Sequence, residues 1–136
     1  MEIVHTNLSG PTKTRGFYGE RYFMIFVDDF TRMMWVVFLK ENFEAFEKFK
    51  LFKNRVENES GVKINWLRSD GGREFTSNEF TILCQVNDIK RQLSTPKTPE
   101  KNGISERRIR FITEASRAMM FDNDVSKTFW KEIVIQ

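Results

Sequence analysis

Residues 22–40, YFMIFVDDFTRMMWVVFLK, form the longest strongly apolar stretch of the sequence. Two runs, residues 22–27 and 33–39, are rich in aromatic and β-branched side chains, and the segment DDFTR separates them. This pattern is typical of a hairpin of two antiparallel strands. Because neither run alternates with polar residues, we expect both strands to be buried within a sheet that helices cover.

The segments around this hairpin alternate between strand and helix patterns. Asn42 is a candidate N-cap of a helix that ends at Ser60 and Gly61. Ser77 is a candidate N-cap of a helix that runs through Val86. The remaining strands are predicted at residues 3–8, 62–69 and 89–93, and the remaining helices at residues 103–121 and 129–136. The order predicts an α/β fold with a five-stranded mixed sheet flanked by helices.

Apolar side chains at helical spacing are predicted to belong to the core rather than to a ligand site. In the helix after Asn42 these are Phe43, Phe46, Phe49 and Phe52. In the helix over residues 103–121 they are Ile104, Phe111, Ile112, Ala115, Ala118 and Met119. Structural roles are also predicted for Trp35, Trp66, Cys84 and His5.

Length and composition limit the classes of protein that fit. The chain has 136 residues, 40% of them hydrophobic, which suits one globular domain over residues 1–136. Its last predicted helix stops abruptly, which suggests truncation at the C-terminal end. No apolar run approaches the roughly 20 residues of a membrane helix, and the N-terminus lacks a secretory signal, so an intracellular protein is expected. One cysteine and one histidine exclude an internal disulfide and a Cys/His zinc site.

The basic residues cluster although the net charge is only +3. Lysines and arginines outnumber acids between residues 90 and 117, where the basic positions are Lys90, Arg91, Lys97, Lys101, Arg107, Arg108, Arg110 and Arg117. A solvated charge run is the usual explanation of such a cluster. A nucleic-acid enzyme would also need it, with cations for the phosphate backbone and carboxylates for metal. The residues alone leave both interpretations open.

Two carboxylates are candidates for that chemistry. Asp70 ends a predicted strand and precedes two glycines, at the kind of position where α/β sheets bind ligands. Glu106 lies in the first turns of a helix, on the polar side that it shares with Arg110. Taken singly, an Asp-Gly turn and a solvated Glu106–Arg110 pair explain them more simply.

Four motifs change this balance: HTNLSGP, YFMIFVDDFTRMMWVVFLK, LRSDGGREFTSNEF and TPKTPEKNGISERRIR. In this order and at these separations, they resemble the integrase catalytic core of copia-type long-terminal-repeat retrotransposons, particularly those of plants. The resemblance covers the chain from about residue 3 to its end. It implies an RNase H-like fold and a polynucleotidyl transferase with an Asp, Asp, Glu triad.

The resemblance assigns the triad residue by residue. Asp70 matches the second acid and Glu106 the third, with 35 residues between them. The first acid belongs in the family phrase HTDLSGP, where this sequence has Asn7. The family cuts and joins DNA with two Mg²⁺ or Mn²⁺ ions, and a neutral amide cannot replace the charge of the bridging aspartate. The resemblance therefore implies weak metal binding by Asp70 and Glu106, and weak or absent activity. Rescue by Asp28 or Asp29 is not expected, because both match turn positions.

Further departures favour a decayed or repurposed copy. Arg73, Asp88 and Ile109 stand where the family has Gly, Gly and Asn. The resemblance implies a nuclear protein that binds DNA and forms a homodimer. The nucleic-acid contacts are expected at Lys101, Asn102, Arg107, Arg110 and Arg117. The alternative is a non-catalytic protein that a host retains for contacts with DNA or with a protein partner.

Overall fold

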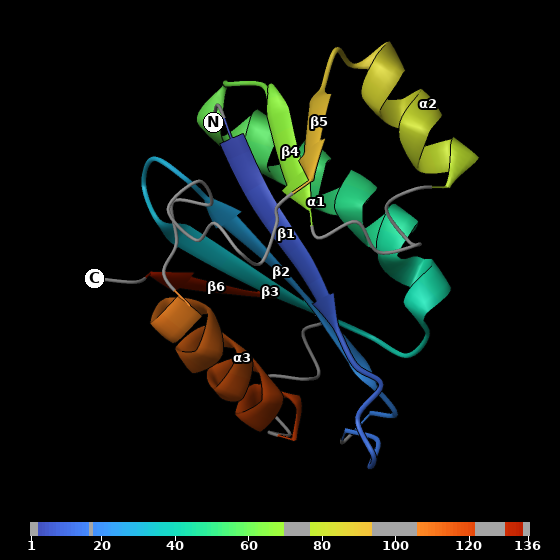
Figure 1. Ribbon diagram of the computed structural model, residues 1–136, viewed down its shortest axis with the longest axis vertical. Coiled ribbons are helices and arrows are strands. Elements are labelled where there is room, and N and C mark those ends of the chain that lie inside the picture. The colour runs from blue at the N-terminus through green and yellow to red at the C-terminus, as the bar shows by residue number, and fades with distance from the viewer. Residues whose placement is uncertain (1–2, 17, 70–76, 94–105, 122–129, 135–136) are drawn as a thin grey trace.

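The computed structural model describes residues 3–16, 18–69, 77–93, 106–121 and 130–134, with the backbone alone for residues 93, 106–109 and 130–134. They form one six-stranded sheet in the order β5-β4-β1-β2-β3-β6, with helices on both faces (Figure 1). The strands are β1 (Ile3–Ser9), β2 (Tyr22–Asp28), β3 (Met33–Leu39), β4 (Trp66–Ser69), β5 (Lys90–Leu93) and β6 (Trp130–Val134).

The predicted hairpin is confirmed. β2 pairs antiparallel with β3 in a register that runs from Tyr22↔Leu39 to Val27↔Met34, and every residue from Phe23 to Asp28 is buried. The turn between them closes with a hydrogen bond from the Arg32 backbone N–H to the Asp28 carbonyl, 2.9 Å long. Continuous apolar runs therefore mark β2 and β3, two interior strands of the sheet, as expected for strands covered on both faces.

Four strands run in the same direction. β1 is antiparallel to β2, which is antiparallel to β3, so β3 runs with β1. β4 is parallel to β1, and β5 is parallel to β4. The carboxyl ends of β1, β3, β4 and β5 consequently lie at one end of the sheet. In sheets of this kind, ligands bind at the carboxyl ends of the strands.

The helices divide into two layers (Figure 1). The helices α1 (Ala45–Ser60) and α2 (Asn78–Val86) cover one face, and α3 (Glu106–Met120) covers the other. Ser77 caps α2 as predicted, since its Oγ accepts a hydrogen bond from the Phe80 backbone N–H. α1 ends at Gly61, whose φ of 73° is left-handed. None of the described helices has the length and apolar character needed to span a bilayer.

Three local predictions were wrong. Residues 129–136 were expected to form a helix, but Trp130–Val134 is a strand, β6, paired antiparallel with β3. A run this short has no decisive periodicity, and the edge of β3 offers backbone partners that satisfy it. Strand β4 is shorter than predicted, because its pairing with β1 begins at Trp66. Asn42 is no cap: it starts a 3₁₀ turn, η1 (Asn42–Glu44), whose entry is fixed by Glu44 Oε1 accepting from the Glu41 N–H at 2.8 Å.

Three side chains predicted to be core are exposed. Phe43 is 77% exposed, because the 3₁₀ turn takes it out of the helical row that buries Phe49 and Phe52. Phe111 is 67% exposed, since α3 contacts the sheet through the row Ile112, Ser116 and Met120. Ala118 is exposed as well. The predictions for Trp35 and Cys84 are confirmed, because both are buried.

Candidate active site

Asn7 lies in the second half of β1, on the face of the sheet that α3 covers. It pairs with Ile25 of β2, and Ile25 belongs to the apolar cluster beneath α3, together with Ile112 and Met120. Directly paired residues of antiparallel strands point to the same face. The side chain of Asn7 is half-buried. It therefore lies on the α3 face of the sheet, close to the carboxyl end of β1.

The strand beside β1 leads to Asp70. The register of β1 and β4 ends at His5↔Arg68, so one further step along both strands puts Ser69 beside Thr6. Ser69 is the last residue of β4 and is buried. Asp70 is the next residue in the chain and lies outside the described residues. β4, which is adjacent to the strand that carries Asn7, thus ends one residue before Asp70 in the chain.

Glu106 is the first residue of α3, and its side chain is among those not described. The other end of α3 packs on the loop that follows β1, where a Cβ added at Gly16 would lie 2.7 Å from Met120 Cγ. At 1.5 Å per residue, Glu106 stands about 21 Å along the helix axis from Met120. The structure thus gives Asn7 and α3 a common face of the sheet.

The hairpin acids are engaged elsewhere, as the sequence predicts. Asp28 pairs with Val4, three residues from Asn7, which is about 10 Å along a strand. Its Oδ2 accepts the Thr31 hydroxyl at 2.7 Å. Asp29 Oδ1 accepts from His5 Nε2 at 2.9 Å and lies 3.6 Å from an Arg32 guanidinium nitrogen. Both carboxylates are therefore engaged with partners in or beside the hairpin turn.

His5 has the structural role predicted for it, and burial lowers its pKa, against the opposing effect of its hydrogen bond to Asp29. The sequence analysis missed the pairing with Asp29. The strand register contains the signal: His5 pairs with Val27, so Asp29, two residues further on, reaches the same face.

The predicted nucleic-acid residues have different outcomes. Arg110 and Arg117 are exposed on α3, Arg107 is described by its backbone alone, and Lys101 and Asn102 lie outside the described residues. Arg117 borders a cavity of about 430 Å³ between α3 and the loop after β1. The other residues that line this cavity are Gly10, Pro11, Thr12, Lys13, Thr14, Phe23 and Phe121. Lys13 was not among the predicted nucleic-acid residues, because it lies in a polar stretch with no motif that would mark it as a binding residue.

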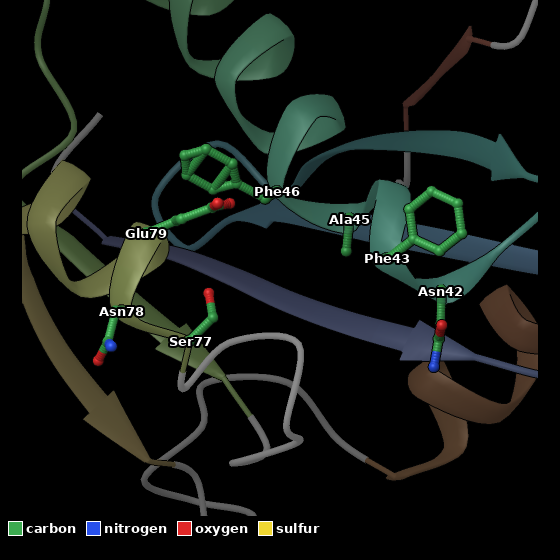
Figure 2. A pocket seen from close by; sticks show the side chains of 7 residues that line it. All are labelled: Asn42, Phe43, Ala45, Phe46, Ser77, Asn78 and Glu79. Atoms are coloured by element: carbon green, nitrogen blue, oxygen red, sulfur yellow. The ribbon is translucent and has the colours of Figure 1, made fainter.

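A larger cavity, of about 540 Å³, lies between the starts of α1 and α2 (Figure 2). Its lining residues are Asn42, Phe43, Ala45, Phe46, Ser77, Asn78 and Glu79. Sequence reasoning missed it, because its two walls are separated by more than thirty positions in the chain.

Within the described part of the chain, no group of three or more His, Cys, Asp and Glu side chains is arranged to hold a metal ion. The acids that the sequence selected, Asp70 and Glu106, have side chains outside that part. Among the described residues of the candidate site, Asn7 offers one neutral oxygen donor. That donor is suited to a hard cation only when carboxylates complete the ligand set.

Comparison with known proteins identifies the class. Residues 4–99 match the family described as "Integrase core domain". The chain is 38% identical over 134 residues, 98% of its length, to the "Retrovirus-related Pol polyprotein from transposon TNT 1-94" of Nicotiana tabacum. It is 35% identical over 131 residues, 96% of its length, to the "Retrovirus-related Pol polyprotein from transposon RE1" of Arabidopsis thaliana. These alignments cover 10% and 9% of the two polyproteins, so the chain spans about a tenth of their length.

The fold has a solved counterpart in the "HTLV-2 integrase catalytic core domain in complex with magnesium (dimeric form)". The TM-score is 0.56 at 21% identity, and the match covers 94% of this chain and 82% of that one. The fold is therefore RNase H-like. The chain belongs to the integrase core domain family, within the copia-type retrotransposon branch that its plant relatives represent.

Proposed function

We propose that this chain is the core of a retrotransposon integrase that binds DNA and holds Mg²⁺ or Mn²⁺ weakly, with DNA strand transfer weak or absent. The observation that carries the proposal is Asn7, an amide on β1 at the position where the family has the first acid of its triad. Asp70 and Glu106 supply the remaining two acids. The donor set keeps the oxygen chemistry that these cations prefer, but it has lost one negative charge.

The chain's own groups have separable roles in this proposal. Asp70 and Glu106 would hold the metal, and Asn7 would contribute a neutral oxygen. When bound, two divalent ions activate the attacking water or 3′-hydroxyl and stabilise the leaving oxygen of the phosphodiester. Removing one charged ligand beside the two ions weakens metal binding by several kcal/mol. Because the ions stabilise the transition state, the rate of strand transfer falls by several orders of magnitude.

Calorimetric titration with Mn²⁺ tests the metal part of the proposal. We expect Asn7→Asp to bind Mn²⁺ much more tightly than the unmodified chain. Asn54→Asp, which makes the same change on the exposed side of α1, should leave affinity unchanged. Equal, tight binding by the unmodified chain and Asn7→Asp would overturn the proposal. A strand-transfer or disintegration assay on the same variants reads out the activity directly.

The DNA part of the proposal rests on exposed cations of α3. Arg110 and Arg117 are exposed on the helix that shares a face with Asn7, and Arg107 lies in its first turn. Replacing all three by Ala should remove about three phosphate contacts, which lowers DNA affinity and flattens its salt dependence. Unchanged binding would overturn this placement and favour a protein partner.

Assembly, location and host use complete the proposal. The HTLV-2 core was solved in a dimeric form, which supports a homodimer here and calls for analytical ultracentrifugation. A nuclear location follows from the DNA substrate and is tested by imaging the tagged chain. The alternative function, a non-catalytic protein retained for DNA or protein contacts, is favoured by Asn7. It predicts that cells lacking the chain show a phenotype that Asn7→Asp does not alter.

A further inference from the structure

The cavity between α1 and α2 opens at the carboxyl end of the sheet. Its first wall, Asn42 to Phe46, follows β3, and its second, Ser77 to Glu79, follows β4 after the segment 70–76. β3 and β4 both run parallel to β1, so both walls stand at the sheet end toward which Asn7 lies. The cavity therefore lies at the same end of the sheet as the proposed active site, on the face opposite the one that carries Asn7 (Figure 1).

The apolar wall of the cavity consists of two aromatic rings. Phe43 is 77% exposed. Phe46 packs edge-on against Phe80, with ring centroids 5.9 Å apart, and Lys50 Nζ lies 5.2 Å from its ring centroid. One ring is thus held in place, and the other is free to receive a flat ligand.

The remaining lining groups are polar. Ser77 Oγ is occupied, because it accepts from the Phe80 N–H at 3.3 Å. The side chains of Asn42, Asn78 and Glu79 make no hydrogen bond or ion pair with any described residue. The aromatic rings suit the flat face of a nucleobase. The two amides and the carboxylate suit its edge, because amides both donate and accept hydrogen bonds and a carboxylate accepts from exocyclic amines.

The charges around the cavity select against a phosphate. Among the described residues that line it there is no Lys or Arg, and Glu79 would repel an anion. The uncharged, planar part of a nucleic acid fits this lining, whereas its backbone does not. A base can reach both ring face and polar edge only when it is unpaired and out of the helical stack.

We infer that this cavity binds an unpaired nucleobase of the DNA substrate, with Phe43 as the stacking residue and Asn42, Asn78 and Glu79 at the base edge. The inference rests on the proposed function, because it requires that the chain bind DNA. It adds a specificity-determining contact for single-stranded ends or flipped bases.

Fluorescence titration with two oligonucleotides tests it, one blunt duplex and one with a single-stranded overhang that carries 2-aminopurine. We expect Phe43→Ala to weaken binding of the overhang DNA about 5- to 100-fold and to leave blunt DNA unchanged. The control is Phe30→Ala, which removes a ring that is 89% exposed. Phe30 lies in the turn between β2 and β3, at the end of these strands away from the cavity. Phe30→Ala should change neither affinity. Asn42→Ala should weaken overhang binding as well.

The outcomes separate this inference from the proposed function. Wild-type affinity of Phe43→Ala for both oligonucleotides would overturn the cavity and leave DNA binding by α3 standing. An equal loss of affinity of Phe43→Ala for blunt and overhang DNA would also overturn the inference, because Phe43 would then contribute to binding without an unpaired base. Failure of the unmodified chain to bind either DNA would overturn both, and binding of an apolar peptide instead would assign the cavity to a protein partner.

Discussion

The two faces of the sheet differ in the side chains that cover them. Beneath α1 and α2, large aromatic rings fill the space: Phe26 stacks on Phe52 with centroids 4.0 Å apart, and Phe49 lies 4.9 Å from Phe80. Beneath α3 the apolar cluster is smaller. The same face of β1 carries polar side chains, Asn7 and His5. The first face holds most of the aromatic core, and the second carries the half-buried Asn7 and the buried His5.

The largest effect that would sharpen this comparison is on the α3 face. We expect Asn7→Asp to raise the strand-transfer rate about 100-fold or more, because the restored carboxylate recovers several kcal/mol of metal binding. Steady-state strand-transfer assays in Mn²⁺ measure it. Asn54→Asp on α1 is the matched control and should have no effect. A rate in Asn7→Asp equal to that of the unmodified chain would show that the decay extends beyond this position.

On the opposite face, Phe52→Ala should lower the free energy of unfolding by about 3–5 kcal/mol. Phe52 is fully buried against Phe26 and Trp35, so the truncation leaves a cavity. Urea unfolding followed by tryptophan fluorescence measures the loss. Phe43→Ala removes the same ring from an exposed site and should stay within about 0.5 kcal/mol. Similar losses in both variants would contradict the assignment of the core.

The helix cap at the start of α2 contributes less. Ser77→Ala should cost about 1 kcal/mol of stability, because the Phe80 N–H loses its acceptor. Ser77→Asp keeps an acceptor at the cap and should retain the stability of the unmodified chain. Chemical denaturation of the three proteins side by side decides the point. If Ser77→Asp were as unstable as Ser77→Ala, the loss would come from packing rather than from the cap.

The smallest effect is the pH response of the α3 face. Burial lowers the pKa of His5 in the folded state, so the unfolded chain binds more protons below its ordinary pKa of 6.5. The His5 contribution is fully present above about pH 6.5 and is lost as pH falls through that value toward the folded pKa. Urea unfolding at pH 7.5 and 5.5 should show a drop in stability that is smaller in His5→Gln. An identical drop in both proteins would assign the response to other groups.

The strands were predictable where the sequence signal was long. The run at residues 33–39 matches β3 at both ends, since seven consecutive apolar residues leave no ambiguity. The run at residues 62–69 overestimated β4, because the strand begins only where β1 provides a partner for Trp66. The error at β6 has the same origin, as pairing with β3 overrides a weak helical pattern.

The candidate site was predictable in part. Motif order selected Asn7, Asp70 and Glu106, and the structure confirms only that Asn7 and α3 share a face. The pairing of His5 with Asp29, 24 positions apart, depends on a strand register that no local pattern encodes. The exposure of Phe43 depends on a 3₁₀ turn at the entry of α1, which shifts one residue out of an otherwise regular row.

The sequence by itself determined the hairpin of β2 and β3, most of the alternation of strands and helices, and the presence of an uncharged side chain at Asn7. These properties are set by neighbouring residues and by side-chain chemistry, which do not depend on how the chain returns on itself. The tertiary structure decided which face Asn7 occupies, what pairs with the edge of β3, and which distant residues enclose the cavity beside α2. Those outcomes depend on strand direction and register, and they arise only when remote segments pack together.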